Sequence, residues 1–423
     1  MYPRLFAAVV ILLGGCVSVP APELTGARQN EEVTPVHYTN ARWYKALESG
    51  IIFERGDRYT RNGVFVSEKP EGAQTVDLGG RFVVPPFGEA HNHSVDGPGS
   101  EAAAATYVSQ GIFYYKNPNG IFAFTEPMLP HWRRADTLDV SFSYGGLSVD
   151  EGHPEKLYRM LLGWGLYRGT EVEALDGAAF YDISTVEMLE EKWPQILANK
   201  PDFLKLYLLN HDTEESAGLG AVEFREVVRR AQAAGLRTSV HIETAQDLAL
   251  AVDAGATEAA HLPAYAIAEA GDERLSRIPD ELIERMGNTG FIVVTTVNVS
   301  QGRDYDEETL KVVTDRQADN LSRMRAAGVG IAIGSDSWGQ TSLNEIRTLR
   351  SLGVFSDEEL LKLWVETPAL SIFPGRAIGR LAPGYEASFL ALDCNPVLDI
   401  ECTQAIHLGI KQGATLVDAG EAP

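Results

Sequence analysis

Strand-like apolar runs alternate with helical patterns along the middle of this chain. The strand-like runs lie at 202–207, 237–241, 256–261 and 329–336, and the helical patterns lie between them at 220–234, 244–254 and 306–327. Strands that are joined through helices pair in parallel, because a parallel pair needs a long crossover connection. The alternation therefore predicts an α/β protein that is built on parallel strands.

Two histidines, His91 and His93, follow a β-type run at 81–84. Side chains at positions i and i+2 of a strand point to the same side, so both imidazoles can bind one metal ion. An H-x-H triplet is a weak motif by itself, because two polar histidines near a turn have the same sequence. Its meaning depends on what other segments bring to the same place.

Each of the strand-like runs also carries a potential metal ligand at or near its end. In a closed (β/α)8 barrel the C-terminal ends of the strands converge on one mouth, and catalytic groups come from several strands. The convergent set would be His91, His93, Lys205, His241, His261 and Asp336. Taken singly, such residues are more often core histidines or strand-edge lysines. Taken together, they predict a metal site.

This ordered series resembles the metal-dependent amidohydrolase superfamily. The likeness is close at VHIETAQDLALAVDAGATEAAHLP (240–263), at GSDSWG (334–339) and at ETPALSIFPGRAIGRLAPGYEASFLALDCNP (366–396). Pro86, Glu89 and Ser388 replace the glycine and the two aspartates that the family usually has at these places. These changes indicate an outlying subfamily.

The resemblance implies an α/β fold in which a (β/α)8 TIM barrel is flanked by a small β-sandwich, built from the N- and C-terminal segments. The 423 residues suit one such barrel with a small accessory domain. The expected division is a signal peptide at 1–16, a flexible tether at 17–39, the barrel at 83–375 and the two parts of the sandwich at 40–82 and 376–423.

The resemblance also implies a binuclear metal centre. One divalent ion would lie among His91, His93 and Asp336, and a second between His241 and His261. Lys205 would bridge both ions as a carbamate that is formed with carbon dioxide. Zinc suits these ligands, although iron, manganese and nickel are also accepted by imidazole and carboxylate groups.

The implied activity is that of a metal-dependent amidohydrolase, which cleaves an amide (C–N) or related carbonyl bond of a small molecule by a metal-bound hydroxide. Asp336 would be the catalytic residue that takes and returns a proton. Two alternatives stay open. One is a mononuclear enzyme, similar to imidazolonepropionases or deaminases, in which Lys205 stays an amine. The other is a non-catalytic lipoprotein that binds a ligand.

Residues 117–168 form an unusually long connection, which predicts a lid over the barrel mouth because long loops there shape specificity. Six side chains follow the expected strands and are candidates for substrate contacts, with Lys116 and Tyr207 preferred. They are Tyr115, Lys116, Tyr144, Tyr207, Asn298 and Trp338.

The chain has 36 Lys and Arg against 59 Asp and Glu, which gives a formal net charge of −23. It has no basic cluster that would follow a phosphate backbone, so nucleic acid is excluded as the expected partner. A small-molecule substrate is expected instead, and a homo-oligomer stays possible.

The N-terminus has the layout of a secretory signal, with Arg4 before a short apolar stretch. The sequence Leu-Gly-Gly-Cys at 13–16 resembles the lipobox of bacterial lipoproteins, whose cysteine is lipidated. This predicts lipidation of Cys16 and an outer-membrane lipoprotein that faces the periplasm of a Gram-negative bacterium. A cleaved signal with an incidental cysteine is the alternative.

The two remaining cysteines, Cys394 and Cys402, are eight residues apart. An oxidising periplasm favours a disulfide between them. Two buried thiols stay possible, because the sequence does not fix the distance between their Cα atoms.

Overall fold

The computed structural model describes residues 34–213, 216–263 and 271–420. The predicted signal peptide, its Cys16 and most of the predicted tether lie outside these residues. The end of the tether was placed wrongly, because strand β1 (Val36–Leu47) begins inside it and pairs with β2 (Gly50–Arg61). No described helix is long and apolar enough to cross a membrane.

Parallel strands form two sheets, as the alternation predicts. The larger has the order β10-β9-β11-β12-β13-β14-β15, and the smaller has the order β6-β7-β8. The strands of the larger sheet are β9 (Gly146–Ser148), β10 (Phe180–Asp182), β11 (Phe203–Tyr207), β12 (Arg237–His241), β13 (Glu258–Ala260), β14 (Ile292–Val294) and β15 (Gly330–Ala332). Those of the smaller are β6 (Phe87–Glu89), β7 (Ile112–Asn117) and β8 (Asp139–Phe142).

Backbone hydrogen bonds connect the two sheets on both sides. The N–H of Ala90, after β6, donates to the carbonyl of Ile333, after β15, at 2.8 Å. On the other side, the N–H of Asp202, before β11, donates to the carbonyl of Phe142 in β8, also at 2.8 Å. The smaller sheet therefore lies between β15 and β11.

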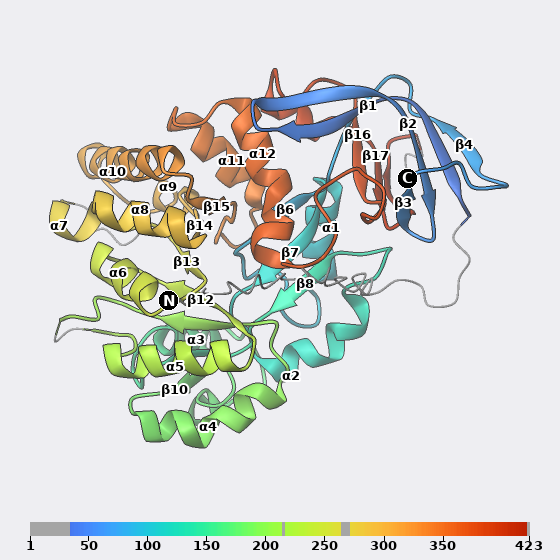
Figure 1. Ribbon diagram of the computed structural model, residues 1–423. Coiled ribbons are helices and arrows are strands. Elements are labelled where there is room, and N and C mark those ends of the chain that lie inside the picture. Colours follow the sequence, from blue (N-terminus) through green and yellow to red (C-terminus); the bar gives the residue numbers. More distant parts are fainter. Residues whose placement is uncertain (1–33, 214–215, 264–270, 421–423) are drawn as a thin grey trace, which may run out of the picture.

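Helices connect the parallel strands and lie outside them. The three predicted helices are confirmed as α5 (Ala221–Ala233), α6 (Ala245–Asp253) and α10 (Glu307–Ala326). Helices α4 (Val186–Ala198), α5, α6, α8 (Asp280–Thr289) and α10 follow one another along one side of the molecule (Figure 1). The remaining helices of eight or more residues are α1 (Glu101–Ser109), α3 (Glu155–Gly163), α11 (Ser342–Ser351) and α12 (Asp357–Thr367).

The N- and C-terminal segments pair in one accessory sheet of eight strands, which lies beside the parallel strands (Figure 1). Its order is β18-β17-β16-β5-β1-β2-β3, with β4 on β1. Its strands besides β1 and β2 are β3 (Val64–Val66), β4 (Gln74–Asp77), β5 (Phe82–Val84), β16 (Phe389–Leu392), β17 (Ile406–Lys411) and β18 (Ala414–Asp418). The predicted pairing of the two ends is confirmed, but β5 belongs to this sheet, so the accessory part extends beyond residue 82.

Buried charges fix the accessory sheet against the parallel strands. Asp139 in β8 is fully buried and accepts from Lys411 Nζ of β17 at 2.5 Å and from Arg376 Nη1 at 2.8 Å. Arg376 also pairs with Glu386 at 2.7 Å. Removal of one partner would leave a buried charge uncompensated, which costs about 3–5 kcal/mol. This network therefore holds the two parts in one arrangement.

A disulfide joins Cys394 and Cys402, whose Cα atoms are 5.5 Å apart. The paired state of these two cysteines is therefore confirmed. The bridge closes the turn between β16 and β17 in the accessory sheet.

Candidate metal centre

A buried carboxyl group connects two of the segments that carry predicted ligands, those after β6 and β15. Glu89, at the end of β6, accepts hydrogen bonds from the backbone N–H and the hydroxyl of Ser335 at 2.7 and 2.8 Å. The N–H of Asp336 donates to the carbonyl of His91 at 2.7 Å. Burial raises the pKa of Glu89 to about 8. These bonds place the residues after β6 against those after β15.

Two of the predicted ligands have a backbone conformation that residues other than glycine rarely adopt. The φ angles of His261 and Asp336 are 78° and 46°. Aspartate and histidine adopt this conformation more readily than most residues, and ten other described residues besides glycine share it.

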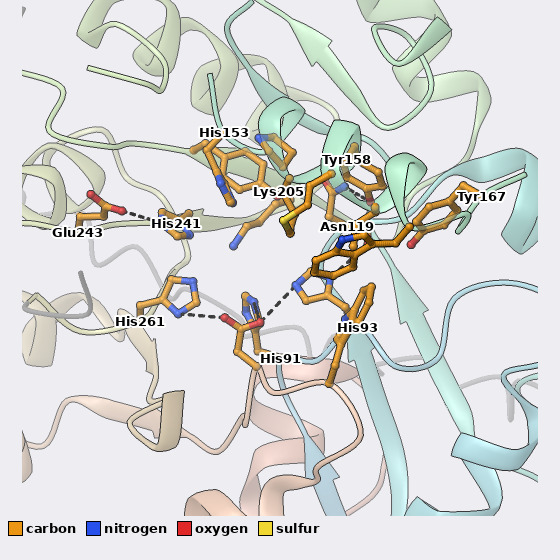
Figure 2. Close-up of a pocket in the computed structure, with 18 of the residues that line it drawn as sticks. His91, His93, Asn119, His153, Tyr158, Tyr167, Lys205, His241, Glu243 and His261 are labelled. Carbon is orange, nitrogen blue, oxygen red and sulfur yellow. Dashed lines mark hydrogen bonds and ion pairs between the residues drawn. The ribbon is translucent and has the colours of Figure 1, made fainter. Parts of the chain in front are cut away.

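Three of the predicted histidines, His91, His93 and His261, lie around the carboxylate of Asp336, and Figure 2 shows them together with His241 and Lys205. Asp336 Oδ1 lies 3.5 Å from His91 Nε2 and 3.4 Å from His93 Nε2, and Asp336 Oδ2 lies 3.9 Å from His261 Nδ1. The rings of His241 and His261 have centroids 4.5 Å apart. One ligand atom each from His91, His261 and Asp336 lie within 4.8 Å of one another, which is a spacing that can hold a metal ion.

Lys205, in the middle of β11, is the least satisfied polar group of the cluster. Its side chain is 1% exposed, and its amine has no hydrogen-bond partner among the described residues. Burial lowers the pKa of this amine to about 7. A buried amine without a partner costs free energy. Because Lys205 also lines a cavity, a group bound there could satisfy its amine.

The protonation of the imidazoles suits metal coordination. Burial lowers the pKa of His91 and His261 well below the usual value and that of His241 to about 3, so these rings are neutral at pH 7. The Nδ1–H of His93 donates to the carbonyl of Asn119 at 3.3 Å, and its Nε2 faces Asp336. Neutral imidazoles beside a carboxylate are the donor set that zinc prefers.

The cluster lies at the bottom of a cavity of about 430 Å³. All six predicted ligands line this cavity, together with Tyr207 and Trp338 from the predicted substrate contacts. Helix α3, from the predicted lid, forms part of its wall. A concave site with convergent polar groups and an apolar wall is typical of enzyme active sites.

Four of the predicted substrate contacts lie elsewhere. Lys116 pairs with the buried Glu258 inside the parallel strands, so its placement argues against a substrate contact. The Tyr115 hydroxyl donates to Asn92 Oδ1 at 3.2 Å, and Tyr144 stacks on the ring of Phe142. Asn298 donates to the Ser337 hydroxyl at 2.9 Å. None of the four lines the cavity that holds the described cluster.

The sequence did not identify several residues of the cavity. His153 lies beside His241, with ring centroids 5.2 Å apart, and burial lowers its pKa to about 3. Glu243 lies 3.7 Å from His241 Nε2. Asn119 and Arg303 also line the cavity. Glu243 follows the predicted ligand His241 by two residues, and this spacing was the one signal in the sequence that Glu243 could lie at the site.

No protein-family model matches the chain. An ochratoxinase of Aspergillus niger is 27% identical over 205 residues, which make up 46% of this chain and 40% of that relative. The chain thus matches less than half the length of this curated relative.

Solved structures match over nearly the whole chain. An amidohydrolase has a TM-score of 0.72 and 19% identity, and the match covers 92% of this chain and all of that one. The A. niger ochratoxinase has a TM-score of 0.71 and 18% identity over 93% of this chain and 98% of its own. A putative prolidase from Bifidobacterium longum has a TM-score of 0.69 and 15% identity over 91% and 95%. The chain therefore has the α/β fold of these amidohydrolases.

Proposed function

We propose that this protein is a metal-dependent hydrolase of the amidohydrolase superfamily, and that its two parallel sheets form a closed barrel with a small β-sandwich beside it. The observation that carries the proposal is the convergence of four imidazoles, the Asp336 carboxylate and the Lys205 amine in one cavity, where that amine has no hydrogen-bond partner among the described residues. The activities in the names of the similar proteins, ochratoxinase and prolidase, support a C–N bond as the target.

His91, His93 and Asp336 would hold one divalent ion, and His241 and His261 a second. Such ions supply an activated water molecule and polarise a carbonyl oxygen. Lys205 would take up carbon dioxide as a carbamate, which explains why a buried amine with a lowered pKa lies among metal ligands. The carbamate would then replace the buried amine that lacks a hydrogen-bond partner.

Asp336 would move the proton. Water adds across the C–N bond, so the carbonyl carbon gains a hydroxyl and the nitrogen gains a hydrogen, and the products are a carboxylic acid and an amine. Asp336 would accept the proton of the attacking water on a carboxylate oxygen and deliver it to the leaving nitrogen. Its position against the three imidazoles gives it access to the reacting centre.

A substrate screen tests the proposed activity directly. Dipeptides, N-acyl amino acids, cyclic amides and lactones would be offered to the purified protein after incubation with zinc and bicarbonate. Release of an amine or acid that disappears on chelation supports the proposal. A ligand that binds without turnover would instead favour the non-catalytic lipoprotein.

Metal content separates the binuclear from the mononuclear enzyme. We expect about two divalent ions per chain after reconstitution, because the six candidate ligands suffice for a two-metal site. Elemental analysis of the purified protein would measure this. One ion per chain in the presence of bicarbonate would contradict the bridging role of Lys205.

We also propose that Cys16 carries lipid and anchors the protein at the outer membrane, facing the periplasm. Firm attachment needs more than one acyl chain, and a lipidated N-terminal cysteine supplies several. Cys16→Ser is expected to move the protein from the membrane fraction to the soluble periplasmic fraction, while metal binding is kept. Cell fractionation and the mass of the N-terminal peptide would measure this. Wild-type protein without added mass in the soluble fraction would refute the anchor and leave the hydrolase untouched.

A further inference from the structure

Large apolar side chains are exposed at the mouth of the cavity. Trp164 is 66% exposed, Trp338 49%, Met160 43% and Leu157 37%. Eleven large hydrophobic side chains are exposed in the described ranges. These four of them line one and the same cavity. Scattered single hydrophobic residues are normal on a surface, but a contiguous exposed group marks a binding site.

The exposed side chains come mainly from one stripe of α3 and the turn that follows it. Leu157, Met160 and Trp164 are spaced at i, i+3 and i+7, so they share one helix face. On the adjoining face, Tyr158 and Leu161 are buried in a small separate core that includes Phe180. One face of the helix is thus well packed against the protein, while the face with Leu157 and Met160 stays exposed.

Hydrogen bonds hold this wall in place. Asn119 Nδ2 donates to the Tyr158 hydroxyl at 2.7 Å, and the Tyr167 hydroxyl donates to the buried Asp96 at 2.6 Å. Asn119 Nδ2 also donates to the carbonyl of Ala179 at 3.0 Å, and this bond helps to hold the Asn119 side chain in place. A wall that is fixed before binding loses little conformational entropy when a ligand packs against it.

The two sides of the cavity differ in polarity. Figure 2 shows Tyr158, Tyr167 and Asn119 on one side of Lys205, and Glu243 with His241 on the other. Arg303 lines the same cavity as Glu243. A site that is apolar on one side and charged on the other orients an amphiphilic ligand across the metal centre.

We infer that the substrate is an amphiphilic amide with a large apolar group, an aromatic ring or an acyl chain of several carbons, that packs against Leu157, Met160, Trp164 and Trp338. A polar or charged group on the other side of the C–N bond would face Glu243 and Arg303. The inference rests on the proposed hydrolase function and adds the class of substrate. The substrate is the expected occupant, because the four apolar side chains line the same cavity as Lys205.

Two series of amides test this inference. One lengthens the acyl group of N-acylglycines from acetyl to octanoyl, and the other compares N-acetylglycine with N-acetylphenylalanine. In at least one series kcat/KM is expected to rise, by about fourfold for each buried methylene group. Values that stay flat or fall with size in both series would overturn the inference, while the hydrolase proposal would stand.

Matched variants locate the effect. Trp164→Ala and Leu157→Ser are expected to raise KM for the largest amide by about tenfold and to raise that for N-acetylglycine much less. The control is Leu129→Ser, because Leu129 is also 37% exposed but does not line the cavity. An equal effect of the control and the two variants would overturn the inference.

A binding measurement covers the case in which no amide is hydrolysed. The hydrolase proposal would then fail, and dissociation constants of the N-acylglycines for the purified protein would replace KM. Tighter binding of longer chains, lost in Trp164→Ala, would still support the apolar subsite. If Trp164→Ala weakens adsorption to phosphatidylglycerol vesicles and leaves amide binding unchanged, the wall is a membrane contact and the inference is wrong.

Discussion

Lys205→Ala is expected to lower kcat/KM by about a thousandfold or more, because the loss of the proposed carbamate would remove several kcal/mol of transition-state stabilisation. The amine is buried in β11 and has no hydrogen-bond partner among the described residues, so its removal breaks no hydrogen bond between them. Metal content is expected to fall in parallel. Steady-state kinetics and elemental analysis of the same preparations would measure both effects.

A matched variant and a rescue experiment separate chemistry from folding. Lys205→Met keeps most of the side-chain volume, so it should fold like the wild type and lose activity like the alanine variant. Propionate or another short carboxylic acid can enter the space that Lys205→Ala vacates, and should restore part of the activity of that variant alone. If Lys205→Ala retains two ions and normal turnover, the carbamate assignment is wrong.

The sequence predicted the candidate ligands because their signals are local. His91 and His93 are two residues apart in the segment that follows a strand, and His241 closes a five-residue strand that runs from Arg237. Parallel strands then bring their ends together without any further information about side-chain packing. Helices α5, α6 and α10 were predicted for the same reason, since their apolar spacing lies within consecutive residues.

The sequence could not predict contacts that depend on long-range pairing. Lys116 was expected near substrate, but its partner Glu258 is 142 residues away, and only the folded chain shows that they meet. His153 lies in a long connection without regular periodicity, so its place beside His241 depends on how that connection packs. Strand β1 begins at Val36 because β2 and β4 pair with it, and the polar sequence there gave no such signal.

Asp336→Asn is expected to lower kcat by about 10²–10⁴-fold, which is the usual contribution of a positioned proton acceptor, while KM changes little. The substitution suits this backbone, because Asp336 has a φ of 46° and asparagine tolerates the left-handed region well. The amide oxygen can still occupy the place of one carboxylate oxygen among the three imidazoles, but it cannot take up the proton.

Asp336→Ala provides the comparison, because it removes the metal ligand as well as the proton acceptor. If Asp336 is both, the alanine variant should lose metal and activity, whereas the asparagine variant should lose mainly activity. Metal content and kcat would be measured for both variants in the same buffer. A large rise in KM with unchanged kcat in Asp336→Asn would argue against the proton-transfer role, because it would place the lost interaction equally in the ground state and the transition state.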